Sequence, residues 1–424
     1  MGRVQERQSR PCQLCSLLHT LTSKGQMTGS NASDVTIVNQ AQVLAEAVAA
    51  VRAEPIVGFD TEFVGESTYE PQLCLIQVAA GERIFVIDPL TGLNLEDFWQ
   101  ALTEPDREVI ALAARQELLF CLRYAGRPPY RVFDPQIAAG LVGYGYPLSH
   151  TNMLQRVLDV RVKGGETFTD WRKRPLTGSQ LQYAAEDVRS LAALRLSLRA
   201  RARELDRELW VDLECARLVH RVVQGQDEER WSRVSGAGRL NRRELAVLRE
   251  LWQWRDATAR AHDSPPRRVI SDDLLMQIVR RKPQSAADFL QLRGTERYRR
   301  DADAIVDAVG KGLRVPQKDL PEALGRDDPP QVQVLGQLAS IISNSLAAEH
   351  QIDVALLATT GDLQDVVRWH LGLTEERPDV LEGWRGEILG RPLLDLLEGR
   401  STIRVADAHS KSPLRIEPRL EARD

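Results

Sequence analysis

Two carboxylates, Asp60 and Glu62, interrupt the apolar stretch IVGFDTEF at residues 56–63. In an extended strand alternate side chains share a face, so both acids point the same way, with Gly58 beside them. Two like charges on one face repel, and burying either of them without a partner is costly. A divalent cation would offset the repulsion, and carboxylate oxygens are the ligands that Mg²⁺ and Mn²⁺ prefer. The alternative is that both acids lie at the edge of a sheet, in water.

A second pair of chemically capable residues, Tyr183 and Asp187, stands four positions apart in LQYAAEDVRSLAALRLSL at residues 181–198. Residues four apart share one face of a helix. Leu181, Ala184 and Val188 form an apolar stripe beside that face. Taken alone, the spacing fits an exposed helix face as well as a site.

The two motifs together resemble ribonuclease D, a member of the DEDD superfamily of 3′→5′ exonucleases whose third motif contains a tyrosine. The resemblance rests on FDTEF and on the later DWRKRPLTGSQLQYAAEDV. It implies that Asp60 and Glu62 form the first motif on a strand, and that Tyr183 and Asp187 form the third motif on a helix. It also implies a ribonuclease H-like fold for residues 34–220.

The second motif departs from the family pattern, which has an aspartate preceded by a histidine in the form H-A-x-x-x-D. In IALAARQELLFCLRYAG the expected aspartate falls on Glu117, and the histidine is missing. Glutamate is one methylene longer but is still an oxygen ligand, so we expect Glu117 to serve as a substitute or to mark reduced activity. Asp134, in VFD, is expected to lie behind the site and orient it.

The resemblance implies hydrolysis of phosphodiester bonds with two divalent cations, Mg²⁺ or Mn²⁺, and release of nucleoside 5′-monophosphates. The implied metal ligands are Asp60, Glu62, Glu117 and Asp187. Tyr183 is expected to orient the attacking water, because a phenol is too weak an acid to serve as a base near pH 7.

Basic and aromatic residues precede the third motif and could contact the substrate. The candidate phosphate contacts are Lys163, Arg172, Lys173 and Arg174. Phe168 and Trp171 could stack on a terminal base or could pack the loop onto the helix.

The segment that follows the third motif resembles an HRDC domain, a helical nucleic-acid-binding module, notably in LWQWRDATARAHDSPPRRVISDDLL. Residues 236–320 carry a net charge of +6 between two acidic flanks, which favours a polyanionic partner. The candidate phosphate contacts here are Arg267, Arg268, Arg280 and Arg281. An acidic second module, with LQDVVRWHLG and LEGWRGEILGRPLLDLLEG, resembles the last domain of bacterial ribonuclease D. We expect it to brace the arrangement of domains around the substrate.

The elements that must position these residues can be predicted from hydrophobic periodicity. Strands are expected at 56–63, 73–80, 83–89 and 108–114, and helices at 40–54, 95–104 and 115–126. A long helical stretch with breaks is expected from about residue 180 past residue 219. The predicted fold is an α/β exonuclease domain with a mixed sheet flanked by helices, followed by two all-α HRDC-type domains. The predicted boundaries are a flexible leader at 1–33, the exonuclease domain at 34–220, linkers at 221–238 and 318–331, helical domains at 239–317 and 332–398, and a flexible tail at 399–424.

Composition limits the class of protein further. Among 424 residues 43% are hydrophobic and 27% charged, and no apolar run is long enough for a membrane span. The five cysteines form no paired framework, which predicts a reduced, cytoplasmic protein. The expected function is a 3′→5′ exoribonuclease that trims structured RNA such as tRNA precursors and acts as a monomer without a membrane partner. The alternatives are a non-catalytic RNA-binding protein and a DNA 3′→5′ exonuclease.

Overall fold

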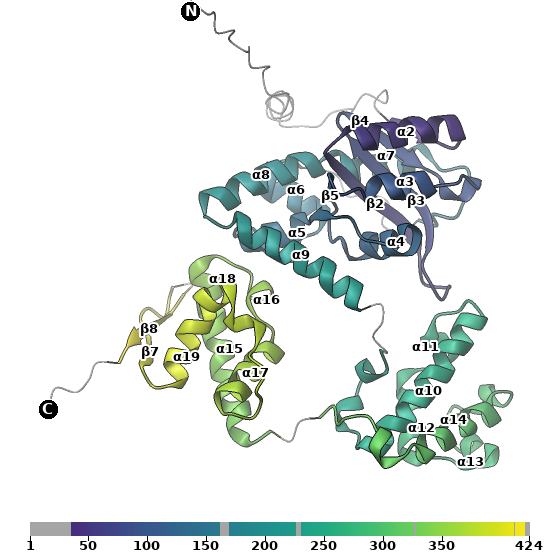
Figure 1. Ribbon diagram of the computed structural model, residues 1–424, viewed down its shortest axis with the longest axis vertical. Helices are drawn as coiled ribbons and strands as arrows, with labels where there is room; N and C mark the ends of the chain where they lie inside the picture. The colour runs from purple at the N-terminus through teal and green to yellow at the C-terminus, as the bar shows by residue number, and fades with distance from the viewer. Residues whose placement is uncertain (1–34, 162–168, 226–229, 326–327, 411, 420–424) are drawn as a thin grey trace, which may run out of the picture.

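The computed structural model describes residues 35–161, 169–225, 230–325, 328–410 and 412–419. Figure 1 shows three bodies along the chain: an α/β domain, a helical domain, and a second helical domain that ends in a short hairpin. The predicted leader at 1–33 lies outside the described residues.

The first domain is built on a six-stranded mixed sheet with the order β1-β4-β3-β2-β5-β6. Neighbouring strands are antiparallel in β2–β3 and β3–β4, and parallel in β1–β4, β2–β5 and β5–β6. The strands are β1 (Val35–Val38), β2 (Ile56–Val64), β3 (Gln72–Ala80), β4 (Arg83–Ile87), β5 (Glu108–Ile110) and β6 (Arg131–Phe133).

Helices cover both faces of this sheet. Phe59 and Val78 point into one apolar cluster, with α2 (Ala41–Ala53), α3 (Glu96–Leu102) and α4 (Arg115–Ala125). Leu75 and Val86 point into a second apolar cluster on the other face. The helices of that side are α5 (Pro135–Leu141), α6 (His150–Leu158), α7 (Gly178–Arg189), α8 (Leu191–Glu204) and α9 (Glu208–Gln224). A 3₁₀ turn, η2 (Pro89–Thr91), follows β4.

Most of the predicted elements of this domain are confirmed, and so is its α/β class. Gly126 ends α4 with φ 72°, a left-handed conformation that glycine adopts at little cost. The predicted long helix is divided into α7, α8 and α9. Strand β1 was missed, because its four residues at the sheet edge carry too short a pattern to recognise.

The first helical domain packs around α10 (Arg242–Ala261), where Leu248 and Leu251 join one apolar cluster. Its other helices are α11 (Pro266–Val269), α12 (Asp272–Arg281), α13 (Ala286–Leu290) and α14 (Ala302–Arg314). Short 3₁₀ turns are η3 (Arg230–Arg233), η4 (Ala237–Arg239), η5 (Glu296–Tyr298) and η6 (Gln317–Asp319). The segment predicted as a linker at 221–238 therefore begins inside α9 and contains turns of regular structure.

The second helical domain is joined to the α/β domain by a buried ion pair. The Arg385 guanidinium pairs with both oxygens of Glu214 on α9, and the Trp384 indole donates to the same carboxylate. Trp384 also stacks on Trp210, with ring centroids 4.9 Å apart. The two charges compensate each other within the interface, so removing either partner would leave a buried charge unpaired. The elements of the second helical domain are α15 (Pro330–His350), α16 (Val354–Leu357), α17 (Thr360–His370), η7 (Asp379–Leu381), α18 (Gly383–Arg385), the π-helical turn η8 (Gly386–Gly390) and α19 (Arg391–Leu397).

The predicted flexible tail contains an antiparallel hairpin of β7 (Ser401–Val405) and β8 (Leu414–Pro418). Ile403 and Ile416 pack against the apolar cluster that contains Leu75 and Val86. Arg404 pairs with Glu417 across the strands. The prediction of a tail without regular structure was therefore wrong for this segment. The many polar residues of this segment obscure the strand-like alternation of Ile403 and Val405 in the sequence. Within the described part of the chain, no helix is both long enough and apolar enough to span a membrane.

Candidate active site

The first two acids lie on the central strand β2, on the face that α7 covers. Asp60 and Glu62 both point to this face, whereas Phe59 and Thr61 are buried on the other. A register shift between Glu62 and Phe63 marks a bulge, and Phe63 is 37% exposed after it. Phe63 therefore does not lie in the core. It contacts Phe120 edge to face at the rim instead.

Helix α7 brings the third acid to this strand. A capping box fixes the start of the helix: the Thr177 side chain accepts from the Gln180 backbone, and the Gln180 side chain accepts in return. Ala184 and Val188 pack on the sheet and turn Asp187 toward β2. One carboxylate oxygen from each of Asp60, Glu62 and Asp187 lies within 4.8 Å of the others. Three hard oxygen donors in one cluster fit a divalent cation of the Mg²⁺ or Mn²⁺ type.

The electrostatics of this cluster show why it needs a cation. Burial, followed by the carboxylates of Glu117, Asp187 and Glu62, raises the pKa of Asp60 well above its ordinary value. Burial, followed by Asp187 and Glu117, raises the pKa of Glu62 to about 8. Without a cation the cluster therefore holds protons at neutral pH, and binding a cation must release them.

Tyr183 lies on the same face of α7, one turn before Asp187. Its ring packs against Trp171, with centroids 6.1 Å apart, so Trp171 anchors the loop rather than offering a free stacking surface. Burial, followed by the Asp187 carboxylate, raises the pKa of the Tyr183 phenol. The phenol thus keeps its proton at neutral pH and is not available as a base.

Glu117 lies beside this cluster but outside the three-carboxylate group. The Thr61 hydroxyl donates to Glu117 Oε1 over 2.9 Å, so the strand residue between Asp60 and Glu62 holds this carboxylate. Burial raises the pKa of Glu117 to about 7. Its carboxylate raises the pKa of both Asp60 and Glu62, which shows that it lies within electrostatic reach of the cluster.

Asp134 positions Glu117 from behind, as the sequence predicts. Its carboxylate accepts from the backbone N–H groups of Ala113 and Ala114, each over 3.1 Å, and caps α5 through Gln136. These two alanines immediately precede α4, and Ala113 adopts φ 56°. Asp134 thereby fixes the turn from which α4 carries Glu117 inward.

One residue near the cluster was missed by the sequence reasoning. His150 Nδ1 lies 3.1 Å from Asp187 Oδ1, and His150 Nε2 lies 3.0 Å from Ser190 Oγ. The imidazole therefore fixes Asp187 from the side of α6. A single histidine in SHTNML has no spacing that would reveal this role.

The cluster predicts an unusual dependence of stability on pH. A carboxyl group whose pKa is higher in the folded state stabilises the fold below its unfolded value, and that stability is lost as pH rises through the folded value. We therefore expect the free energy of unfolding, in chelator, to fall by about 1–3 kcal/mol between pH 5 and pH 9 from Glu62 and its neighbours. Mn²⁺ should restore it more at pH 9 than at pH 6. Thermal unfolding with and without Mn²⁺ measures this, and equal stabilisation at both pH values would contradict it. The Glu62→Gln variant should flatten the dependence.

The predicted phosphate contacts before the third motif are only partly compatible with the structure. Lys163 and Phe168 lie outside the described residues. Arg174 is engaged internally: it pairs with Asp88 over 2.6 and 2.7 Å and donates to the Cys74 carbonyl. Its assignment to phosphate is therefore withdrawn. Arg172 pairs with Asp170 at the surface, and Lys173 is exposed beside it.

The predicted contacts on the first helical domain lie at the surface. Arg268, Arg280 and Arg281 are exposed, and Arg267 is exposed while pairing with Asp272 over 3.3 Å. This domain contacts the catalytic one through Tyr69, whose hydroxyl donates to Asp256 over 2.8 Å and whose backbone N–H donates to Asp263. Tyr69 belongs to the loop that follows β2, so the helical domain touches the segment next to the first motif.

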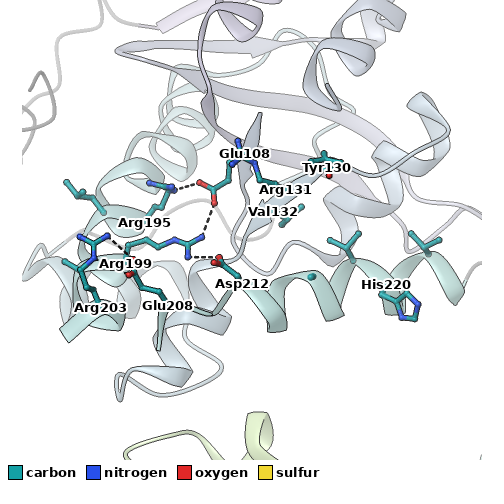
Figure 2. A pocket seen from close by; sticks show the side chains of 15 residues that line it. Glu108, Tyr130, Arg131, Val132, Arg195, Arg199, Arg203, Glu208, Asp212 and His220 are labelled. Carbon is teal, nitrogen blue, oxygen red and sulfur yellow. Dashed lines mark hydrogen bonds and ion pairs between the residues drawn. The ribbon is translucent and has the colours of Figure 1, made fainter. Parts of the chain in front are cut away.

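A large cavity of about 870 Å³ lies away from these acids, between α8, α9 and the start of β5. Figure 2 shows that Arg195, Arg199 and Arg203 are directed at carboxylates rather than into open space. Arg195 and Arg199 pair with Glu108, Arg199 pairs also with Asp212, and Arg203 pairs with Glu208. Neither the acids of the cluster nor Tyr183 line this cavity, so it is not the place of the chemistry.

Three family models match successive parts of the chain: 3′-5′ exonuclease over residues 35–203, HRDC domain over residues 244–309, and the C-terminal HRDC domain of ribonuclease D over residues 333–393. Ribonuclease D of Pseudomonas paraeruginosa is 32% identical over 351 residues, which cover 82% of this chain and 93% of that protein. Ribonuclease D of Bartonella henselae is 31% identical over 371 residues, which cover 86% and 90%.

A solved structure matches this chain over almost the whole length of the solved protein. The crystal structure of Escherichia coli RNase D, described as an exoribonuclease involved in structured RNA processing, matches with a TM-score of 0.76 at 29% identity. The match covers 86% of this chain and 99% of that one. These matches span the α/β domain and both helical domains, and the chain belongs to the ribonuclease D family of 3′→5′ exoribonucleases.

Proposed function

We propose that this protein trims the 3′ ends of structured RNA, tRNA precursors among them, and releases nucleoside 5′-monophosphates. The observation that carries the proposal is the convergence of Asp60, Glu62 and Asp187, from a strand and a distant helix, within 4.8 Å. The similar Escherichia coli enzyme is described as acting in structured RNA processing, which supports the substrate class.

The carboxylates of Asp60, Glu62 and Asp187 would hold two divalent cations, Mg²⁺ or Mn²⁺, with Glu117 contributing from beside them. When bound, the cations would activate a water for attack and stabilise the leaving oxygen. Asp60 lies centrally on β2 and is the residue we assign to bridging. His150 and Thr61 hold two of the carboxylates in place, over 3.1 and 2.9 Å.

Tyr183 would position the attacking water. Its phenol keeps its proton at neutral pH, so it would donate a hydrogen bond to that water rather than accept a proton from it. The first helical domain would hold the body of the RNA through Arg267, Arg268, Arg280 and Arg281, which are exposed on a segment of positive net charge. Arg172 and Lys173 would contact phosphates nearer the 3′ end.

We also place the protein in the cytoplasm, as a monomer. Cys74, Cys121 and Cys215 are free and buried, which suits a reducing compartment.

Comparing substrates tests this function. Purified protein with Mg²⁺ or Mn²⁺ is given a 3′-extended tRNA precursor, an unstructured RNA and a single-stranded DNA of the same length. The precursor should be shortened to the base of its acceptor stem, and RNA should be degraded at least tenfold faster than DNA. Equal rates on RNA and DNA would favour a DNA exonuclease instead. Binding of RNA without cleavage in either metal would favour a non-catalytic RNA-binding protein.

A further inference from the structure

Gln77 lies directly opposite Asp60 in the pairing of β2 with β3. Residues that face each other across antiparallel strands stand on the same face of the sheet, with Cβ atoms about 4.5–5.5 Å apart. The Gln77 side chain is therefore on the catalytic face, beside the carboxylate assigned to bridging.

The carboxamide of Gln77 has no hydrogen-bond partner within the described part of the chain. Its side chain is 0% exposed, and both Nε2 and Oε1 are buried without a partner. A carboxamide can donate two hydrogen bonds and accept two more, so burying it unpartnered disfavours the fold. A polar group is rarely retained at such a position without a use in the site.

The other neighbours of this side chain cannot satisfy it. Leu75 and Ala79 flank it along β3 on the same face, and Val86 stands opposite it on β4. Ala184 and Val188 of α7 cover this part of the sheet. Asp60 is thus the polar residue that the register places next to Gln77.

The Asp60 carboxylate, in turn, has few hydrogen-bond donors among the described residues to stabilise its negative charge. Its carboxylate receives a hydrogen bond from the Thr61 backbone, and the charges around it come from other carboxylates. To hold cations, the Asp60 carboxylate must be ionised and kept in one orientation. A hydrogen bond from an amide N–H group stabilises the ionised carboxylate. In metal centres, groups that orient the ligands typically affect cation affinity by about 10–100-fold.

We propose that Gln77 is a positioning residue for the metal-bridging carboxylate: its amide N–H donates to Asp60 through one ordered water, and so fixes the orientation that binds the cations. The inference rests on the proposed function, because it assigns Asp60 to the cations. Gln77 itself touches neither the cations nor the reacting atoms.

The test compares the wild type with Gln77→Leu, which has similar volume and no polar atoms. Mn²⁺ affinity is measured by electron paramagnetic resonance, kcat and KM on RNA by product release, and Tm in chelator by calorimetry. Ser343→Ala is the matched control, because Ser343 Oγ is also buried without a partner but lies on α15 of the last domain. Gln77→Met serves as a second apolar variant.

Both Gln77 variants should bind Mn²⁺ about tenfold more weakly and lower kcat by about 10–100-fold, with KM unchanged. Their Tm in chelator should stay close to that of the wild type, because the carboxamide makes no hydrogen bond to another described residue that the fold would lose. The control should leave Mn²⁺ affinity and kcat unchanged.

Three results would overturn the inference. The first is Mn²⁺ affinity and kcat within twofold of the wild type in both variants. The second is a loss of Tm in both variants that matches the loss of activity, because that indicates a purely structural role. A wild type that neither binds Mn²⁺ nor degrades RNA overturns the proposed function itself, and that result is visible before any variant is compared.

Discussion

Replacing Asp60 with asparagine is expected to lower kcat on RNA by roughly 10³–10⁵-fold, the largest effect of any single substitution in this chain. Asparagine keeps the volume and one oxygen of the side chain but removes the charge. Asp60 lies on the central strand, where the carboxylates of Glu62, Glu117 and Asp187 repel its charge. Without its charge, the remaining acids can hold at most part of the cation pair. The measurement is the initial rate of mononucleotide release with saturating RNA and Mn²⁺.

The same substitution should stabilise the metal-free protein, which separates loss of function from loss of fold. Asp60 is partly buried among three like charges, so neutralising it relieves repulsion and desolvation. We expect Tm in chelator to rise, and the gain in Tm on adding Mn²⁺ to shrink. Asp97→Asn, on the exposed start of α3, is the matched control and should change neither quantity. Activity of Asp60→Asn within tenfold of the wild type would mean that Asp60 holds no cation.

The second large effect is expected at Glu117, where the chain departs from the family pattern. Glu117→Gln can still accept the hydrogen bond from Thr61 but carries no charge, so a purely structural role would survive it. We expect kcat to fall by roughly 10²-fold, because the charge supports the cation site from beside the three-carboxylate group. Wild-type activity in this variant would show that the cations do not need Glu117.

The variants Glu117→Asp and Thr61→Val test the length and the hydrogen bond of the Glu117 side chain separately from its charge. Aspartate restores the acid of the family pattern but is one methylene shorter, so it loses the contact to Thr61 Oγ1 at 2.9 Å. If glutamate serves adequately, Glu117→Asp should stay within about tenfold of the wild type. A rate far above the wild type would mean that glutamate is a handicap here. Thr61→Val keeps the shape and removes the donor, so it should lower kcat less than Glu117→Gln does.

The site residues that could be predicted from the sequence are those whose type is strongly restricted by the chemistry. Two acids two apart on an apolar strand, and a tyrosine four before an acid on a helix, together resemble the first and third motifs of ribonuclease D, which implies one shared site. Their convergence within 4.8 Å agrees with that reasoning, although the fold that produces it depends on β2 and α7 packing across residues far apart in the chain. The apolar pattern predicted the two elements, and the resemblance to ribonuclease D predicted that their acids meet.

Contacts made by single polar side chains could not be predicted in the same way. Thr61 reads as a strand residue facing the core, yet its hydroxyl holds Glu117 from α4. His150 and Gln77 reach the cluster only because α6 and β3 lie beside α7 and β2. Arg174 looks like a phosphate contact from its basic neighbours, but Asp88, far away in sequence, neutralises it. Such pairings depend on tertiary geometry rather than on local spacing.

Identifying the first product from a 3′-labelled RNA tests the central claim most directly. The protein, Mn²⁺ and an RNA labelled in its terminal nucleotide are mixed, and early products are separated by chromatography. The carboxylate cluster predicts that the label appears first as a nucleoside 5′-monophosphate, in the wild type and not in Asp60→Asn or Asp187→Asn. Label released as an oligonucleotide or as a nucleoside 3′-phosphate, or release that survives both substitutions, would contradict the account.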